Sequence, residues 1–599
     1  MRKTKTTALV ALLVVVLAIT ATLAILAIPA RKPEVIVHVE EVCYYLDQLK
    51  KNITGLPSTA FSDEKASAEQ RKALLNEVDA VLLHVEACEK QAAINKLWND
   101  IYDKIEKWIV KPYQSDLLNI VSRIAVLLLD PVRTDAGLVS GEVLGELGKE
   151  VRVYRGIPYA APPVGDLRWK PPQPVTPWKG IKICTEFSKA PMQAEQLWCP
   201  PPYSEDCLYL NVLTPAKKET DRLPVMVWFH GGGFSIGSGN MKPWATSLSL
   251  PQHGVVLVTV NHRLGPMGLL ALPALSKESP HGVSGNYLFL DLIAALQWVQ
   301  KNIAAFGGDP NCVTIFGESG GAGKVDALLA SPLAKGLFHR AILESGANAE
   351  GVGPKILTLK EAEALGEMLV TKYLGIDPND LAALRAIPAE KIIKAAMNLT
   401  RDLGAITVTG VSVIDAPVVD GWFLPDYPTN IFKAGKQNNV PFIVCANLGE
   451  LIANKTFLRM PQLIKAYVDR LSSASKLGTK AYACIFSHVP SKWRKEGVLA
   501  YHGIEIPYVF GDLERLKEPL HFYIFARPSG ATQPDPGLTE EDKWVAEAMM
   551  TMWVQFAKTG DPSVEGLVTW PAWEPTTDQY LEIAWPLQVR SGFSKIVKP

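Results

Sequence analysis

The chain has 599 residues, enough for about four domains of ordinary size or for one large domain with additional segments. With 48% hydrophobic and 20% charged residues, 44 Gly and 44 Pro, the composition is that of a globular protein and excludes collagen-like, disordered and disulfide-scaffold classes. Lys plus Arg and Asp plus Glu are 61 each, so no net charge attracts nucleic acid, and we expect no nucleic-acid partner.

The first predicted element is an apolar helix at the N-terminus. Residues 8–28 contain no charge, Gly or Pro, and at about 1.5 Å per residue such a helix covers the roughly 30 Å core of a bilayer. A cleaved signal peptide usually has a shorter apolar stretch and a small-residue cleavage site, which Ala-Ile-Pro-Ala at residues 27–30 matches poorly. We therefore predict a single-pass membrane anchor over residues 1–32, with the rest of the chain outside the cytoplasm. The alternative is a cleaved signal sequence and a secreted protein.

Residues 33–130 are predicted to form a small helical hairpin or bundle. Two apolar stripes have helical spacing, Leu74, Val78, Val81, Val85 and Cys88 in the first, and Ile94, Leu97, Ile101, Ile105 and Trp108 in the second. Ser67 and Gln70 fit a capping box at the start of the first helix, and a shorter helix is expected over residues 42–49. Cys43 and Cys88 form either a disulfide or two unrelated core thiols.

Residues 131–599 are predicted to form one α/β domain. Short β-branched or aromatic runs at residues 225–229, 255–260, 313–316 and 442–444 end at Gly, Pro or Asn, and helical stretches such as residues 288–306 lie between them. This alternation predicts a mostly parallel sheet wrapped by helices. In such sheets ligands bind at the carboxyl ends of the strands, so the motifs that follow these runs are the candidates for a functional site.

The run at residues 313–316 leads into Gly317-Glu318-Ser319-Gly320-Gly321, a G-x-S-x-G sequence followed by a helical stretch. A strand that meets a helix through so sharp a turn lifts the central hydroxyl clear of the sheet, which makes Ser319 the candidate nucleophile. Gly323 and Lys324 suggest a phosphate-binding loop instead. That alternative fails because Glu318 stands where its first Gly is required and Val325 where a Ser or Thr is required.

A second glycine-rich segment, His230-Gly231-Gly232-Gly233-Phe234, follows the run at residues 225–229. A carbonyl attacked by a serine develops negative charge on its oxygen, and preorganised backbone N–H groups stabilise that charge. We predict that Gly232, Gly233 and Gly320 donate these hydrogen bonds, because the segment follows a strand run upstream of the G-x-S-x-G turn.

Beyond these two loops, further motifs complete a family pattern between about residues 133 and 583. They are Arg155-Gly156-Ile157-Pro158-Tyr159-Ala160, Ser204-Glu205-Asp206-Cys207-Leu208-Tyr209-Leu210-Asn211, Phe306-Gly307-Gly308-Asp309-Pro310 and Phe556-Ala557-Lys558-Thr559-Gly560-Asp561-Pro562. The chain resembles the type-B carboxylesterases, the cholinesterase-related branch of the α/β-hydrolases. The resemblance implies an α/β-hydrolase fold and a serine hydrolase that cleaves small-molecule carboxylic esters through an acyl-enzyme.

The same resemblance implies the partners of the nucleophile. His502 lies in a segment similar to the family's catalytic-histidine loop, and Glu450 follows the run at residues 442–444 in a sequence similar to the family's Asn-x-x-Glu. Asp420 is the second choice for the acid, although its Pro-Val-Val-Asp-Gly setting is typical of a turn. Glu318 and Ser345 match family positions beside the site and are expected to tune it.

Several residues depart from the family pattern. Gly320 replaces the usual Ala after the nucleophile, and Lys324 and Asp326 add charges that would need partners if they faced the sheet. Cys207 matches a half-cystine of the family, with Cys199 or Cys184 as its partner. Trp198 is expected to pack in the core, or else to border the entrance of the site.

No zinc or dinucleotide-binding motif is found, so we expect neither a cofactor nor a metal. Two alternatives to a carboxylesterase are considered. A catalytically silent adhesion or scaffold protein would lack a member of the trio Ser319, Glu450 and His502, all of which are in place. A lipase for long-chain esters would need an open site with a long apolar acyl pocket, which nothing in the sequence requires.

Overall fold

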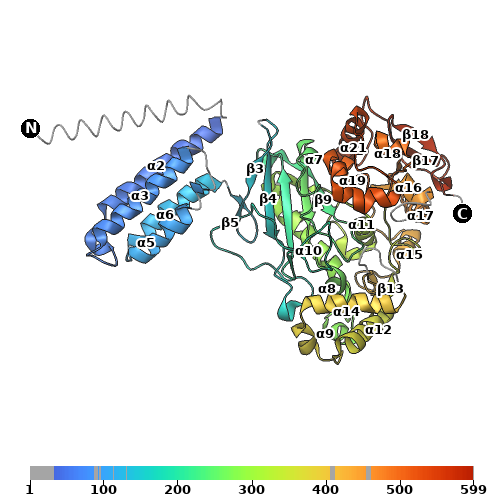
Figure 1. Ribbon diagram of the computed structural model, residues 1–599, viewed down its shortest axis with the longest axis horizontal. Helices are drawn as coiled ribbons and strands as arrows, with labels where there is room; N and C mark the ends of the chain where they lie inside the picture. Colours follow the sequence, from blue (N-terminus) through green and yellow to red (C-terminus); the bar gives the residue numbers. More distant parts are fainter. Residues whose placement is uncertain are drawn as a thin grey trace, which may run out of the picture. The chain divides into compact units, whose positions relative to one another are not determined.

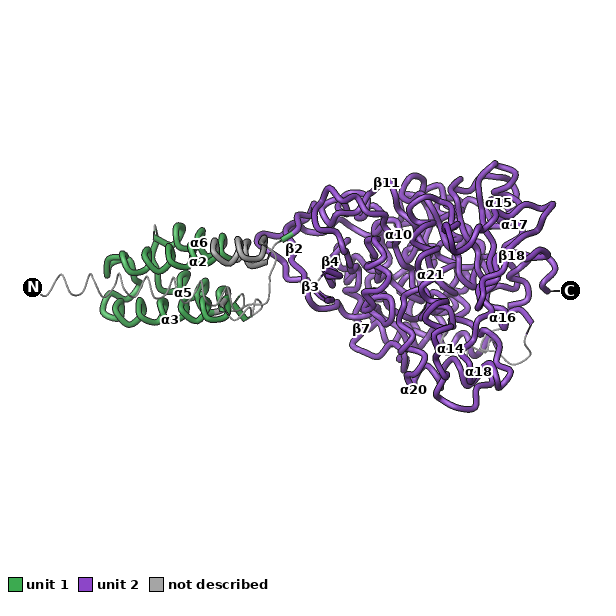
Figure 2. The backbone as a smooth tube through the Cα atoms, turned by 90° about the horizontal axis from the view of Figure 1, so that it is seen from above, with its two compact units in different colours: residues 1–131 green, residues 132–599 purple. Residues whose placement is uncertain are grey.

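The computed structural model describes residues 33–86, 92–93, 96–111, 113–129, 131–146, 148–404, 412–452 and 460–597. The chain divides into two compact units, one ending at Pro131 and the other beginning at Val132 (Figure 2). No helix among these residues is both long and apolar enough to cross a membrane. The predicted anchor over residues 8–28 lies outside the described residues.

The first unit is helical. Its elements are α2 (Pro33–Gly55), α3 (Ser67–Glu86), a π-helical turn (Leu97–Tyr102), α5 (Asp103–Trp108) and α6 (Tyr113–Leu129). Helix α2 contacts both α3 and α6. The described members of both predicted stripes lie on the buried side, with Leu74, Val78, Val81, Leu97 and Ile101 fully buried. This burial confirms the helical spacing, whereas α2 is much longer than expected and α6 was not predicted.

One expectation for the first unit is wrong. The N–H of Gln70 donates to the carbonyl of Ala66 at 2.9 Å, and Gln70 Oε1 has no hydrogen-bond partner among the described residues, so the capping box with Ser67 does not form. Asp63 instead holds the turn that precedes this helix, because its Oδ1 accepts from the N–H groups of Lys65 and Ala66 at 3.0 and 3.2 Å. Cys88 and Ile94 lie outside the described residues, and with them the Cys43–Cys88 pairing.

An 11-stranded sheet forms the centre of the second unit (Figure 1). In chain order its strands are β3 (Glu142–Leu144), β4 (Val151–Pro158), β8 (Tyr209–Thr214), β9 (Leu223–Phe229), β10 (Val256–Val260), β11 (Gly308–Glu318), β12 (Arg340–Glu344), β15 (Phe442–Asn447), β16 (Ala481–Phe486), β17 (Gln579–Ile583) and β18 (Gln588–Ser591). In space they follow the order β18-β17-β16-β15-β12-β11-β9-β10-β8-β4-β3.

The sheet is mostly parallel, as the sequence predicts. From β10 to β17 in spatial order each strand runs parallel to its neighbours, and only β8, β4 and β3 at one edge and β18 at the other pair antiparallel. The four predicted strand runs correspond to β9, β10, β11 and β15. Because these strands are parallel, their carboxyl ends lie at one edge of the sheet, where the motif residues follow them.

Alternate side chains of the central strands fill two cores, one on each face of the sheet. Val227 and Ile315 point to the face covered by α10 (Tyr287–Asn302) and α17 (Leu463–Lys476). Trp228 and Phe316 point to the opposite face, which is covered by α21 (Glu540–Thr559). Both faces of a parallel sheet are buried in this way, which explains why its strands are continuous apolar runs in the sequence.

The remaining longer helices are α11 (Gly320–Ala330), α12 (Leu359–Met368) and α14 (Ala389–Asp402), and short helices α16 (Leu448–Ile452) and α19 (Ile506–Val509) follow the motif loops. A disulfide joins Cys445 to Cys484 on the neighbouring strands β15 and β16. Cys184, Cys199 and Cys207 are buried free thiols, so the expectation that Cys207 is a half-cystine is wrong. Cys184 and Cys207 pack as small apolar side chains in the core.

Candidate active site

Ser319 lies at the junction between β11 and α11. Its backbone has φ 56° and ψ −123°, a conformation that residues other than glycine rarely adopt. Its N–H donates to the carbonyl of Glu344 at 2.8 Å. The flanking glycines are required sterically, because a Cβ at Gly317 or Gly321 would lie only 2.5 or 2.0 Å from the carbonyl oxygen of Phe229. This is the strained turn expected for an exposed nucleophile.

The glycine-rich loop, residues 230–237, lies against this turn. Gly232 and Gly233 have φ of 90° and 58°, values that glycine adopts without steric cost. A Cβ at Gly320 would lie 2.6 Å from the backbone nitrogen of Gly233, so the start of α11 and the loop are in close contact. The three glycines predicted as donors therefore line one cavity together with Ser319.

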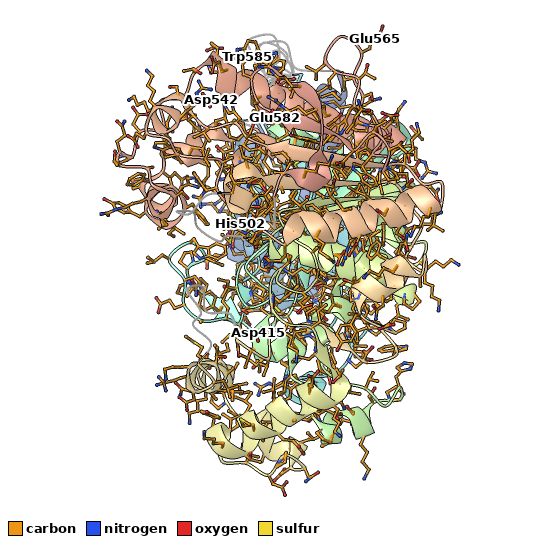
Figure 3. The ribbon with its side chains drawn as sticks, turned by 90° about the vertical axis from the view of Figure 1, so that its right-hand side faces the viewer. Asp415, His502, Asp542, Glu565, Glu582 and Trp585 are labelled. Carbon is orange, nitrogen blue, oxygen red and sulfur yellow. A yellow bond between two sulfur atoms is a disulfide. The ribbon has the colours of Figure 1, made fainter. Side chains whose placement is uncertain are left out.

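His502 and Glu450 form a buried hydrogen-bonded pair. The Nδ1 of His502 lies 2.8 Å from Oε1 of Glu450, which is placed by α16 at the end of β15. Asn447 Nδ2 donates to the same Glu450 oxygen at 3.1 Å and fixes the carboxylate. His502 lines the same cavity as Ser319, and Figure 3 shows it among the side chains of this part of the chain.

Asp420, the second choice for the acid, has other partners. Its Oδ1 accepts from the N–H groups of Trp422 and Leu424 at 2.9 and 3.0 Å, and its Oδ2 accepts from Asn286 at 2.9 Å. These contacts make it a turn residue.

Two other histidines that follow Ser319 in the chain pair with other side chains. His488 contacts Asp542 at 2.9 Å, and His521 contacts the hydroxyl of Tyr501 at 2.9 Å.

A second carboxylate, Glu318, contacts the other nitrogen of the histidine, with Oε1 3.2 Å from His502 Nε2. Burial disfavours the imidazolium of His502, but Glu318 and Glu450 more than offset this and raise its pKa above the usual range. Burial also raises the pKa of Glu318, and Glu450 adds to that increase, while His502 and Lys324 oppose it. The two carboxylates therefore both favour the protonated form of the imidazole.

Ser345 and Glu505 form a further layer behind the histidine. Ser345 Oγ donates to Glu505 Oε1 at 3.3 Å, and Asn447 Nδ2 donates to Glu505 Oε2 at 2.5 Å. Burial raises the pKa of Glu505, and it raises that of Glu344 to about 8. The sequence analysis assigned no role to Glu505, although its position three residues after His502 in the same loop was the available signal.

The cavity has a volume of about 510 Å³, within the range typical of small-molecule sites. Apolar side chains line most of it, namely Trp198, Phe234, Met241, Trp244, Met460, Ile506, Ile524 and Phe525. Trp198 is half-buried and packs edge-on against Phe525, so it borders the cavity and the expectation of core packing is wrong. Among the described residues no group of three or more His, Cys, Asp or Glu side chains could hold a metal ion.

The charges added near the nucleophile both have partners. Lys324 Nζ donates to the carbonyl of His230 at 2.6 Å. Asp326 forms a two-pronged ion pair with Arg470, whose Nε and one terminal nitrogen lie 3.1 Å from its two oxygens. All four of these residues are buried. A buried charged side chain needs a polar partner, and these contacts supply one for Lys324 and one for Asp326.

The model of the Carboxylesterase family matches residues 130–473 and 454–595. The chain is 36% identical to the fumonisin B1 esterase of Sphingopyxis macrogoltabida over 73% of this chain and 84% of that protein. It is 33% identical to the para-nitrobenzyl esterase of Bacillus subtilis over 74% and 93%. A solved PNB esterase structure has a TM-score of 0.63 at 31% identity and covers 77% of this chain and 97% of that one.

A carboxylesterase structure from Geobacillus stearothermophilus has a TM-score of 0.62 at 30% identity, over 77% of this chain and 97% of that one. The matched region contains the sheet, the strained serine turn and the glycine-rich loop. The chain therefore belongs to the carboxylesterase family, the type-B branch of the α/β-hydrolases, and it is a carboxylic ester hydrolase.

Proposed function

We propose that the protein hydrolyses small-molecule carboxylic esters through an acyl-enzyme on Ser319, with His502 as the base and Glu450 as the residue that orients it. The contact that supports this most is the 2.8 Å approach of His502 Nδ1 to Glu450 Oε1, and His502 and Ser319 line the same cavity. A carboxylate in that position holds the ring in the tautomer whose Nε2 accepts a proton.

In the first half of the reaction, the Ser319 Oγ–H proton passes to His502 Nε2 while Oγ bonds to the ester carbonyl carbon. The N–H groups of Gly232, Gly233 and Gly320 stabilise the oxyanion that forms. The C–O bond to the alcohol then breaks, and His502 returns its proton to the departing alkoxide. Water repeats the sequence on the acyl-enzyme and releases the acid.

The substrates are expected to be esters of moderate size that carry an apolar group. Mainly aromatic and aliphatic side chains line the cavity of about 510 Å³, so burial of an apolar acyl or alcohol group is favourable there. Two relatives are named as esterases for fumonisin B1 and for para-nitrobenzyl esters, and we propose that the present chain also acts on small-molecule esters.

Hydrolysis of 4-nitrophenyl esters from acetyl to palmitoyl tests the proposal, with Ser319→Ala as the comparison. The serine mechanism predicts that the variant loses about 10⁴-fold or more in kcat at every chain length that the enzyme accepts. Equal turnover by both proteins would contradict it. A maximum at palmitoyl would indicate a lipase for long chains.

We also propose that residues 1–32 anchor the enzyme in a membrane with the hydrolase unit outside the cytoplasm. The support is the uncharged apolar run over residues 8–28, flanked by basic residues. Membrane fractionation combined with N-terminal sequencing tests it. Sedimentation with membranes and an intact N-terminus is expected, whereas a soluble protein that begins beyond residue 28 would show a cleaved signal sequence.

A further inference from the structure

Lys324 is a fully buried lysine in the helix that follows the nucleophile. It lies five positions after Ser319 on α11 and has no exposed surface. Lysine is almost never buried completely without a compensating partner, so a side chain in this place requires a structural reason. Its ammonium group donates to the backbone carbonyl of His230 at 2.6 Å, the first residue of the glycine-rich loop.

The same helix turn contacts the loop at further points. A Cβ at Gly320 would lie 2.6 Å from the nitrogen of Gly233 and 3.2 Å from that of Phe234, and a Cβ at Gly323 would lie 2.9 Å from the Phe234 ring. The Lys324 Nζ lies 5.9 Å from the centroid of that ring. The glycines of this turn therefore allow the helix to approach closely, and Lys324 fixes the loop at its start.

Beyond this contact, side chains from outside the loop hold its other end. Ser235 Oγ donates to Oδ2 of the buried Asp415 at 2.5 Å. Gln193 exchanges two hydrogen bonds with the backbone of Gly237, at 2.8 and 2.9 Å. The loop is thus fixed at His230, Ser235 and Gly237, and the predicted oxyanion donors Gly232 and Gly233 lie between the first two of these points.

The electrostatic surroundings of Lys324 disfavour a charged group that lacks a partner. Burial lowers the pKa of Lys324 to about 7, and Glu318 opposes this decrease. The rings of His230 and His262, which also lie near the lysine, stack at 4.7 Å, and burial keeps the pKa of both well below the usual value. Burial therefore disfavours a charge on either ring, and the lysine donates to the backbone carbonyl of His230.

We propose that Lys324 is a positioning residue that holds the glycine-rich loop so that the N–H groups of Gly232 and Gly233 point at the oxyanion of the transition state. The inference rests on the proposed serine mechanism. Lys324 acts through the His230 carbonyl and does not touch the substrate. A loop released at His230 would still bind the ester but would present its donors less accurately, so the loss should fall on the transition state.

Lys324→Met tests this, because methionine keeps the unbranched apolar stem and removes the donor. With active sites counted by titration, we expect kcat for a 4-nitrophenyl ester to fall by about 10- to 100-fold while KM changes by less than about 3-fold. The affinity for a trifluoromethyl ketone, which forms a tetrahedral adduct, should weaken by the same factor as kcat. The affinity for an unreactive amide analogue of the ester should not change.

The control is Val325→Ala, which removes buried volume from the next residue of the same helix and leaves the loop contact intact. We expect it to lower the melting temperature and to keep kcat within about twofold, since its loss is one of packing alone. If Lys324→Met does not fold, Lys324→Gln, whose amide is too short to reach the carbonyl in the same way, undergoes the same measurements with the same expectation.

Unchanged kcat and unchanged ketone affinity in the folded Lys324 variant would overturn the inference, and so would a loss confined to KM. Neither result would affect the proposed function, which is tested by the loss of activity in the Ser319→Ala variant. Conversely, full activity of Ser319→Ala would refute the serine mechanism whatever the Lys324 variants do.

Discussion

The imidazole of His502 is held between two carboxylates. Nδ1 lies 2.8 Å from Oε1 of Glu450, and Nε2, the nitrogen that would receive the serine proton, lies 3.2 Å from Oε1 of Glu318. All three side chains are buried, so water screens these interactions poorly. Glu318 therefore raises the proton affinity of the imidazole that is proposed to act as the base.

Glu318→Gln is expected to shift the acid limb of the pH dependence of kcat/KM to lower pH. The carboxylate stabilises the imidazolium and raises the pKa of His502, so its removal lowers that pKa, and the ring becomes a free base at lower pH. A neighbouring opposite charge typically changes a pKa by about 1 to 3 units, and we expect a shift of about 1 unit. The profile is measured with a 4-nitrophenyl ester.

The matched control for that experiment is Glu541→Gln, which removes a more exposed carboxylate that pairs with Arg494. Its profile should coincide with that of the unmodified enzyme. An acid limb of Glu318→Gln that stays in place or moves to higher pH would show that Glu318 does not set the pKa of the base.

Arg470→Met is expected to destabilise the second unit by about 3–5 kcal/mol, because it leaves the buried carboxylate of Asp326 without its counter-charge. Urea unfolding monitored by tryptophan fluorescence measures the change. On the same helix, Lys465→Met removes an exposed partner of Asp469 and should cost less than about 1 kcal/mol. Equal effects of the two substitutions would show that the buried pair contributes no more than the surface pair.

Trp198→Ala is expected to weaken the use of esters with aromatic alcohol groups. Trp198 lines the cavity and packs edge-on against Phe525, and loss of such a contact is worth about 1–2 kcal/mol, or about 5- to 30-fold in kcat/KM. Methyl esters of short acids should be affected much less. Leu197→Ala, at a neighbouring side chain that is 79% exposed, is the control, and an equal loss in both variants would contradict a specific role for Trp198.

Motifs that act within a short stretch of chain could be read from the sequence. The strained turn at Ser319 depends on its own flanking glycines, and the runs that became β9, β10, β11 and β15 are continuous because both faces of the sheet are buried. Helix α6 was missed although Leu117, Val121 and Ile124, all buried, carry a clear helical spacing.

Contacts between distant parts of the chain could not be read in this way. The sequence showed that Lys324 and Asp326 needed partners, but their partners His230 and Arg470 are 94 and 144 residues away and are brought together only by the order of the strands. The same holds for the Cys445–Cys484 disulfide, which depends on β15 and β16 being neighbours in register. The family resemblance instead pointed to Cys207, whose thiol is free.

Covalent labelling locates the nucleophile most directly. Phenylmethanesulfonyl fluoride transfers its sulfonyl group to an activated serine oxygen and releases fluoride, and peptide mass mapping identifies the modified residue. We expect one sulfonyl group per chain, on Ser319, in step with loss of esterase activity, and no labelling of Ser319→Ala. Labelling at another residue that accompanies the loss of activity, or full activity with Ser319 modified, would contradict the serine mechanism.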